Sequence, residues 1–307
     1  MAITITWPAS NAGVATAIRI YAATSKLADD ALGEPIATLA GDALSFVWTP
    51  PTDNTVYYFR IATDRGPDTQ LGPNQVFGYF STTGPGPQAP IRGDWTLGYF
   101  GRVPVAQMIA GSALRTAVGA GSIGSAVADA QIQYYYKFVR EGKILFYPAG
   151  AILTTVSFDQ LYNLGLVYGT DDNGAYPAGA ALTPTNQKKV ITIAGFNFLA
   201  RCFKGSSLPT TTLITTAAAD KEGSEWDQTM GRINLSPTLA WNKDNAWDDS
   251  TSLPVTTQGT VTQHLFNATG ATKTALHRGA NAVIDSINQL GTGQATYGYS
   301  PLLELQF

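Results

Sequence analysis

The first candidate for chemistry in this sequence is a glycine-rich run. Gly119-Ala-Gly-Ser-Ile-Gly124 matches the pattern of a dinucleotide-binding loop, whose backbone amides bind a pyrophosphate at a helix N-terminus. That function needs a buried strand before the glycines and a helix after them. Here the preceding residues have helical spacing and no repeated strand–helix–strand unit follows. The sequence therefore favours a flexible turn and predicts no cofactor.

Histidine and cysteine residues are the next candidates for chemistry. A Ser-His-Asp site needs a single histidine, and the chain has two, His264 and His277. Neither lies beside a Gly-x-Ser-x-Gly nucleophile turn, which the sequence lacks. A zinc site needs more ligands than Cys202 and two separated histidines can supply. We predict no catalytic residue and no metal ligand, and we expect that the chain is not an enzyme.

Acidic residues offer two further kinds of site. Asp171-Asp-Asn-Gly174 and the run from Asn242 to Asp249 could supply oxygen ligands to Ca²⁺, although neither completes an EF-hand loop. Turns stabilised by Asp and Asn side chains are the commoner explanation of such runs. Glycoside hydrolysis needs two carboxylates at a defined separation in space, which spacing along the chain does not reveal. The acidic residues therefore predict no metal site and no specific reaction.

One tryptophan precedes the second of these acidic runs and another lies within it. Trp241 and Trp247 lie in a region rich in Thr, Ser, Asn, Asp and Gly, from about residue 205 to 260. Exposed aromatic rings stack on sugars or fill a pocket of a partner protein. We take Trp241 and Trp247 as candidate interface or glycan contacts, and we favour packing in a core or subunit interface over sugar binding.

The composition excludes several classes of protein. The chain has 307 residues, 44% of them hydrophobic and only 13% charged, so it can bury substantial cores. Its net charge of −3 leaves no basic surface for nucleic acid. The N-terminal residues show no secretory signal, and no apolar run reaches the ~20 residues that cross a bilayer. One cysteine permits no internal disulfide, which fits folding in a reducing cytoplasm.

Residues 1–82 show the alternating pattern of an antiparallel β-sandwich. The inward-facing apolar residues are Ile3, Ile5 and Trp7, then Ile18 and Ile20, then Leu44, Phe46 and Trp48, then Tyr57, Phe59 and Ile61, and then the run Val76 to Phe80. The strand from Thr55 to Asp64 is similar to the one that carries the tyrosine corner, with Tyr57 as the corner residue. The segment resembles a fibronectin type III or immunoglobulin-like domain whose first strand is missing or very short.

A proline- and glycine-rich run, Thr83-Gly-Pro-Gly-Pro-Gln-Ala-Pro90, is expected to be a linker. Residues 91–307 then form a larger β-rich α+β domain, so the predicted fold class is mainly β with short helices. We expect one or two helices within 104–118, a helix over 157–165, and another over 275–290. Hairpins are expected at 131–147 and 189–203, and the last eleven residues predict a strand tied into a sheet or interface.

Residues 97–307 resemble a module that recurs in virion structural proteins of tailed phages. The segments that carry the resemblance are Leu97 to Pro104, Tyr136 to Phe146, Ser157 to Gly169, Ile191 to Gly195 with Arg201, Gly223 to Asp227, and Tyr299 to Glu304. In Gly223-Ser-Glu-Trp-Asp227 we expect a turn in which a serine or glutamate oxygen accepts from backbone N–H groups. Trp226 is expected to pack in the core beside it. We call this arrangement a cap-and-anchor turn. The insertion at 171–189 and the segment 260–296 depart from the family pattern.

The resemblance implies a non-enzymatic virion protein, made in the host bacterial cytoplasm, that assembles with itself and with neighbouring particle proteins. We expect a tail-associated or fibre component, with a trimer as one option for its homo-oligomer. A capsid decoration protein on the head is the alternative, and a carbohydrate-binding module for host adhesion, which would contact a surface glycan, is a further one. No nucleic acid partner and no membrane insertion are expected.

Overall fold

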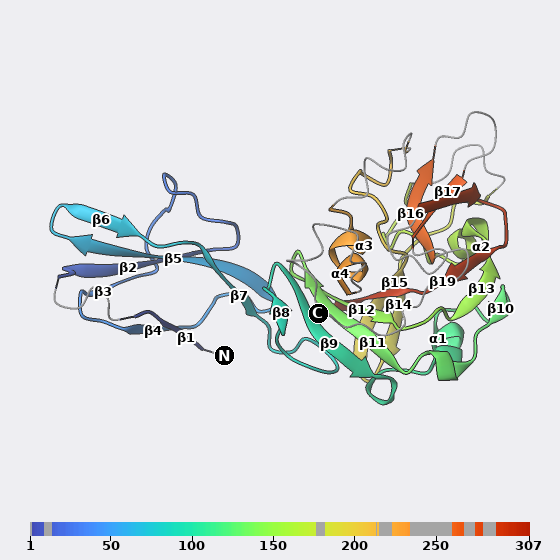
Figure 1. The fold of residues 1–307 in the computed structure, drawn as a ribbon, viewed down its shortest axis with the longest axis horizontal. Coiled ribbons are helices and arrows are strands. Elements are labelled where there is room, and N and C mark those ends of the chain that lie inside the picture. The colour runs from blue at the N-terminus through green and yellow to red at the C-terminus, as the bar shows by residue number, and fades with distance from the viewer. Residues whose placement is uncertain are drawn as a thin grey trace. The chain divides into compact units, whose positions relative to one another are not determined.

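The computed structural model of the chain describes residues 2–8, 14–175, 182–212, 214, 223–233, 260–266, 274–278 and 287–307. It is mainly β, with several sheets and a few short helices, as the sequence predicts (Figure 1). The chain divides into two compact units. The first consists of Met1–Thr83 and Gly93–Thr96, and the second of Gly84–Arg92 and Leu97–Phe307.

Two sheets of the first unit share one apolar core. Their strands are β1 (Ile3–Thr6), β2 (Ala17–Ala23), β3 (Ala37–Ala40), β4 (Ser45–Trp48), β5 (Thr55–Arg65), β6 (Asp68–Leu71) and β7 (Gln75–Tyr79). β1 pairs with β4, while the larger sheet has the order β3-β2-β5-β6, and β7 pairs with the first half of β5. Alternate side chains from both sheets, including Ile5, Ile20 and Phe59, are buried together. The period-two pattern in the sequence thus marks the buried face correctly except at Leu44, which was predicted to face inward and is 47% exposed.

Tyr57 lies at the centre of this core and binds the backbone that leads into its own strand. Its buried hydroxyl donates to the carbonyl of Thr52 at 3.1 Å and accepts from the N–H of the same residue at 3.0 Å. Trp48 packs edge-on against the rings of Tyr57 and Phe59, with centroids 5.1 and 5.2 Å apart. The sequence therefore identifies correctly the tyrosine that bonds to the backbone upstream.

Replacing Tyr57 with Phe should weaken the first unit. The substitution keeps the ring but leaves the Thr52 backbone groups without this partner, at a cost of about 1–3 kcal/mol in the free energy of unfolding. Hydrogen exchange of the β5 amides in the full chain measures the change. Tyr58→Phe is the matched control, because the Tyr58 hydroxyl has no hydrogen bond among the described residues. Equal protection of β5 in the two variants would contradict the assigned role.

The larger sheet of the second unit has seven strands in the order β14-β15-β20-β12-β11-β9-β8. Their bounds are Lys189–Ile193, Phe196–Arg201, Leu302–Gln306, Lys143–Pro148, Tyr134–Arg140, Leu97–Pro104 and Arg92–Gly93, in the same order. Two of its hairpins turn through residues with positive φ, Glu141-Gly142 and Ala194-Gly195, as two-residue hairpin loops require. Both predicted hairpins are confirmed. The predicted C-terminal strand is confirmed in part: Leu302–Gln306 form β20, which lies between β15 and β12, whereas Tyr297–Tyr299 form a separate strand of another sheet.

A second sheet has the order β10-β13-β19-β16-β17-β18. Its strands are Ser125–Ala126, Leu153–Val156, Tyr297–Tyr299, Thr260–Phe266, Thr274–Arg278 and Ile287–Gly291. The helix predicted over 275–290 is wrong, because this stretch contains β17 and β18 instead. β17 pairs with a strand on each side and buries four consecutive residues, Ala275 to Arg278. Pairing on both edges outweighs the helical spacing of the apolar residues.

Short helices connect the strands. They are η1 (Val105–Gln107), α1 (Gly111–Ala117), η2 (Asp129–Gln131), α2 (Phe158–Asn163), α3 (Glu225–Gln228) and α4 (Met230–Ile233). The helices predicted within 104–118 and over 157–165 are confirmed. α2 has a full capping box, in which Ser157 Oγ accepts from the N–H of Gln160 and Gln160 Oε1 accepts from the N–H of Ser157. Residues of α3 and α4 pack on aromatic side chains of the seven-stranded sheet, and the ribbons of both helices lie beside this sheet (Figure 1).

The segment expected to be a linker is bound to the second unit through a buried lysine. Lys137, in the middle of β11, donates from Nζ to the carbonyls of Pro85 at 2.9 Å and Pro87 at 2.6 Å. Its ammonium also lies over the rings of Phe100 and Phe146, at 4.9 and 5.3 Å from their centroids. Prolines suit this position because they have no backbone N–H that would need a partner there. Residues 84–92 are therefore part of the second unit.

The buried ammonium makes stability depend on pH. Burial lowers the pKa of Lys137 to about 7, from an ordinary value of 10.5. Between these values the unfolded chain binds more protons than the folded chain, so the free energy of unfolding should rise with pH, by up to about 1.4 kcal/mol per unit. We expect Lys137→Met to have a flatter dependence than the native chain in urea titrations at pH 7, 8 and 9. Lys26→Met, at an exposed position, should keep the native slope, and equal slopes in all three proteins would refute the explanation.

Candidate functional site

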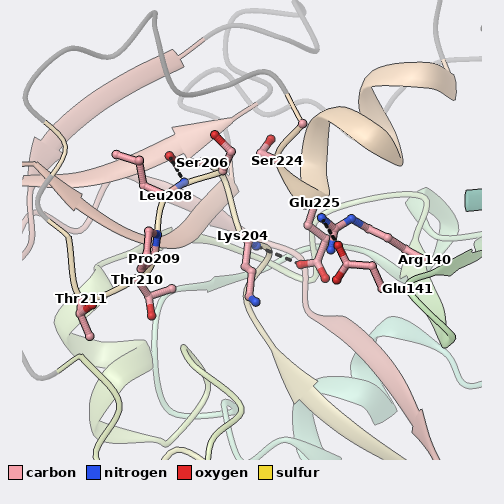
Figure 2. Close-up of a pocket in the computed structure, with 12 residues that line it drawn as sticks. Arg140, Glu141, Lys204, Ser206, Leu208, Pro209, Thr210, Thr211, Ser224 and Glu225 are labelled. Atoms are coloured by element: carbon pink, nitrogen blue, oxygen red, sulfur yellow. Dashed lines mark hydrogen bonds and ion pairs between the residues drawn. The ribbon is translucent and has the colours of Figure 1, made fainter. Parts of the chain in front are cut away.

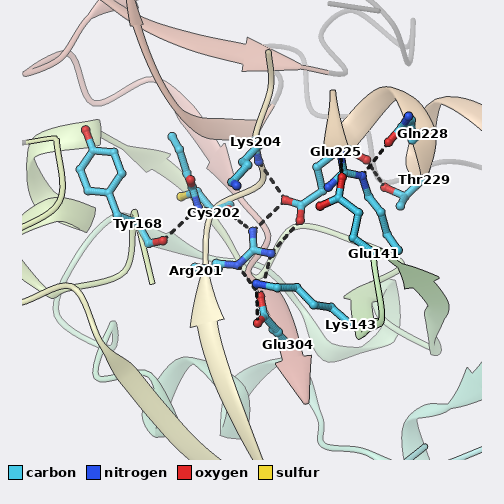
Figure 3. A network of polar contacts seen from close by, with 12 residues as sticks. Glu141, Lys143, Tyr168, Arg201, Cys202, Lys204, Glu225, Gln228, Thr229 and Glu304 are labelled. Carbon is cyan, nitrogen blue, oxygen red and sulfur yellow. Dashed lines mark hydrogen bonds and ion pairs between the residues drawn. The ribbon is translucent and has the colours of Figure 1, made fainter. Parts of the chain in front are cut away.

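A buried cluster of charged side chains joins two strands and a helix of the second unit (Figure 3). Arg201 ends β15, Glu304 lies in the neighbouring β20, and Glu225 begins α3. The guanidinium binds Glu225 through two parallel hydrogen bonds of 2.7 Å and Glu304 through bonds of 2.9 and 3.1 Å. All three residues are less than a tenth exposed. The cluster is therefore a charge network held away from water.

The register of the sheet places Glu304 between two cations. Glu304 stands opposite Leu199 of β15 and Leu145 of β12, so Arg201 and Lys143 are its diagonal neighbours on the same face. Lys143 Nζ lies 2.9 Å from Glu304 Oε1. A slip of one residue in β20 would move the carboxylate to the opposite face. The cluster thus forms only when β20 pairs in this register.

The shifts in pKa show that the cluster stays ionised. Burial alone would raise the pKa of Glu225, but the charge and the hydrogen bonds of Arg201 outweigh burial, and the pKa lies below its ordinary value. The pKa of Glu304 is lowered in the same way, by Arg201 and then Lys143 against the effect of burial. Each carboxylate is matched by a cation in contact with it. We find here a paired structural network without an unpaired group available for proton transfer.

The predicted cap-and-anchor turn is confirmed beside this cluster. Ser224 caps α3 by accepting from the N–H of Asp227 at 3.1 Å, and Glu225 Oε2 accepts from the N–H of Lys204 at 3.0 Å. Trp226 is 1% exposed and packs edge-on against Phe203, with ring centroids 5.2 Å apart. The turn therefore fixes the start of α3 to both the charge cluster and the aromatic core.

A polar pocket of about 420 Å³ opens next to the charge cluster (Figure 2). It is formed by the end of β11 with its turn, by the segment that follows β15, and by the start of α3. Its lining residues are Arg140, Glu141, Lys204, Ser206, Ser207, Leu208, Pro209, Thr210, Thr211, Gly223, Ser224 and Glu225. Hydroxyl and charged side chains dominate this lining, so the pocket suits a hydrophilic ligand.

The carboxylates that line the pocket already have cationic partners. Glu225 is bound by Arg201, and Glu141 Oε1 lies 2.8 Å from Arg140 Nη2. Arg140 also donates from Nε to Gln228 Oε1 at 2.7 Å, which holds its guanidinium at the pocket edge. Lys204 is exposed, and its ammonium has no ion pair or side-chain hydrogen bond within the described part of the chain. It is therefore the pocket's cation available to a ligand.

The structure separates the residues that the sequence singled out. Trp241 and Trp247 lie outside the described residues, so their proposed contacts remain predictions. His264 is buried in β16, where its Nε2 lies 2.9 Å from the carbonyl of Leu208 and burial lowers its pKa. His277 is buried in β17, and the centroids of its ring and the ring of Tyr297 are 3.5 Å apart. Each histidine is packed as part of the sheet.

Two other predicted motifs form turns, and the run from Asn242 to Asp249 lies outside the described residues. Gly119 to Gly124 follow α1 and lead into β10, which is the reverse of the strand-to-helix order in a dinucleotide loop. Asp172 Oδ1 accepts from the N–H of Gly174 at 2.7 Å, and Asp171 pairs with Lys188 at 2.7 Å. Among the described residues, no group of three or more His, Cys, Asp and Glu side chains could hold a metal ion.

Sequence reasoning did not find the pocket itself. Its Ser and Thr residues belong to the polar stretch after residue 205, but Lys204 and Arg140 carry no local signal. Searches with this chain found no matching family model, no matching curated protein and no matching solved structure. None of the described helices has both the length and the apolar composition needed to cross a membrane.

Removing the cation of the buried cluster should strongly destabilise the second unit. Arg201→Met leaves two buried carboxylates without their shared partner, and we expect a loss of about 3–5 kcal/mol in the free energy of unfolding. Lys188→Met breaks an exposed ion pair with Asp171 and should cost less than about 1 kcal/mol. Urea unfolding of the full chain, followed by circular dichroism, compares the two variants. Similar losses in both would show that the cluster does not anchor this unit.

Proposed function

We propose that the chain is a non-enzymatic structural component of a tailed-phage particle, tail-associated or part of a fibre or appendage. One observation carries the proposal. Arg201, Glu225 and Glu304 belong to three of the segments by which the sequence resembles phage virion proteins, and they meet in one buried cluster. If these sequence segments define a conserved phage module, we expect their residues to contact one another in the folded chain. This convergence supports a common architecture more than a common reaction.

The first unit supports a role in docking or spacing. We infer that it is a fibronectin type III or immunoglobulin-like sandwich whose first strand is missing or very short. The strand order β3-β2-β5-β7 beside β1-β4, and the bonds from Tyr57 to the Thr52 backbone, favour this assignment. Such domains host many functions, so the fold suggests adhesion or spacing without naming a partner.

A structural role also agrees with how the second unit uses its polar side chains. The buried charges of Arg201, Glu225 and Glu304 are paired with each other, and the two histidines are packed in strands. The composition, poor in charge and rich in aromatic residues, suits burial against other proteins, where apolar area contributes ~25 cal/mol per Å² before the costs of association. We propose assembly with neighbouring virion proteins and with further copies of the chain, a trimer being one arrangement.

Locating the chain in intact particles tests this proposal. We expect mass spectrometry of purified infectious particles to detect the chain, and an electron-microscopy map to place it on the tail or its fibres. Density on the head, with binding of the purified chain to tailless capsids, would replace the tail assignment with capsid decoration. Absence from infectious particles would refute a virion role.

The non-enzymatic part of the proposal has its own test. The purified full chain should form oligomers in light-scattering measurements and should leave host surface polysaccharides intact. A monodisperse single subunit that cleaves a defined glycosidic bond would overturn this part. Binding of intact glycans, lost on Trp241→Ala or Trp247→Ala, would instead favour a carbohydrate-binding adhesion module.

A further inference from the structure

The pocket beside the charge cluster has the size and the stiffness of a ligand site. Its volume of about 420 Å³ lies within the range of about 300–1,000 Å³ that is usual for small-molecule sites. Its walls come from three separate segments that are fixed to the core. The N–H of Lys204 is bound by Glu225, the N–H of Leu208 by Ser206 Oγ, and the carbonyl of Leu208 lies against His264. The pocket is thus formed by the fold before any ligand arrives.

The charges in the pocket favour an anionic ligand. Both lining carboxylates are engaged, Glu225 by Arg201 and Glu141 by Arg140. The ammonium of Lys204 has no counter-ion among the described residues, and its side chain extends between the Thr210–Thr211 segment and Glu225 (Figure 2). A lysine of this kind is a point charge with several rotatable N–H donors, which suits a carboxylate or phosphate oxygen.

The remaining lining favours a ligand that also carries hydroxyl groups. Five Ser and Thr side chains line the pocket, namely Ser206, Ser207, Thr210, Thr211 and Ser224. Ser206 Oγ and Ser224 Oγ already accept from a backbone N–H and keep the O–H to donate, whereas the hydroxyls of Thr210 and Thr211 can both donate and accept, which matches the hydroxyl groups of a sugar. No aromatic side chain is among the lining residues that the structure describes, so these residues offer a neutral sugar no ring to stack on. Recognition must then depend on charge and hydrogen bonds.

We propose that this pocket binds an acidic sugar unit, with the carboxylate or phosphate of the sugar on Lys204 and its hydroxyls on the Ser and Thr side chains. The inference does not depend on a virion role, because it needs only the described pocket. The acidic group could be a uronic acid carboxylate or a sugar phosphate, and both give the same contact with the ammonium.

Titration calorimetry of the full chain with single sugars tests the proposal. The probes are glucuronate, glucose 6-phosphate, inorganic phosphate and glucose. We expect at least one of the two acidic sugars to bind, more tightly than glucose and inorganic phosphate, and the preferred acid identifies the source of the charge. Equal binding of glucose and the acidic sugars, or no binding of either acid, would overturn the assignment.

Substitutions at Lys204 tie the binding to this pocket. Lys204→Met removes a charge-assisted contact and should weaken binding of the preferred acid by at least about tenfold, while Lys204→Arg keeps the charge and should restore most of the affinity. Lys188→Met, which removes a positive charge elsewhere on the second unit, should bind like the native chain. Thermal unfolding checks that all variants are folded. Loss of affinity in Lys188→Met equal to that in Lys204→Met would locate the binding elsewhere.

Discussion

The buried guanidinium of Arg201 is the constraint on which the second unit depends. A charge removed from water must be neutralised in place, and both of its partners come from distant parts of the chain. Glu225 lies 24 positions away and Glu304 lies 103 positions away. The pairing of β15 with β20 and the docking of α3 must therefore form together. Apolar residues of similar volume could match the stability of such a cluster, so we infer that its main contribution is to fix register and docking.

A second buried cation is accommodated in a different way. The ammonium of Lys137 is surrounded by the carbonyl oxygens of Pro85 and Pro87 and by two aromatic rings. The guanidinium of Arg201 is instead bound by two carboxylates. Carbonyls and rings stabilise a cation less than a carboxylate does, which agrees with a lowered pKa for Lys137 and the raised pKa of Arg201. The two buried cations also differ in the parts of the fold that they connect. The arginine joins sheet to helix, and the lysine holds a proline-rich segment onto the sheet.

The features that could be predicted from the sequence are those decided by a few adjacent residues. Both hairpins depend on turns with a glycine at positive φ, and the capping box of α2 depends on Ser157 and Gln160 alone. The helix expected over 275–290 failed because β17 is held by strands on both of its edges, and apolar spacing says nothing of such pairing. The contacts that bind the predicted linker to the second unit escape the sequence for the same reason, since the lysine that makes them lies about fifty positions further on. The pocket needs three segments that only the folded chain brings together.

The pocket and the charge cluster share Glu225, and this sharing links the function of the surface to the stability of the core. The residue lines the pocket, while its carboxylate is occupied by Arg201 and by the N–H of Lys204. The backbone that carries the Lys204 ammonium is therefore fixed by the same group that neutralises the core. A site held in this way loses little conformational freedom when it binds a ligand, which favours affinity from few contacts. It also follows that a substitution in the cluster would disturb the pocket without touching a ligand, whereas a substitution at the exposed end of Lys204 leaves the core intact.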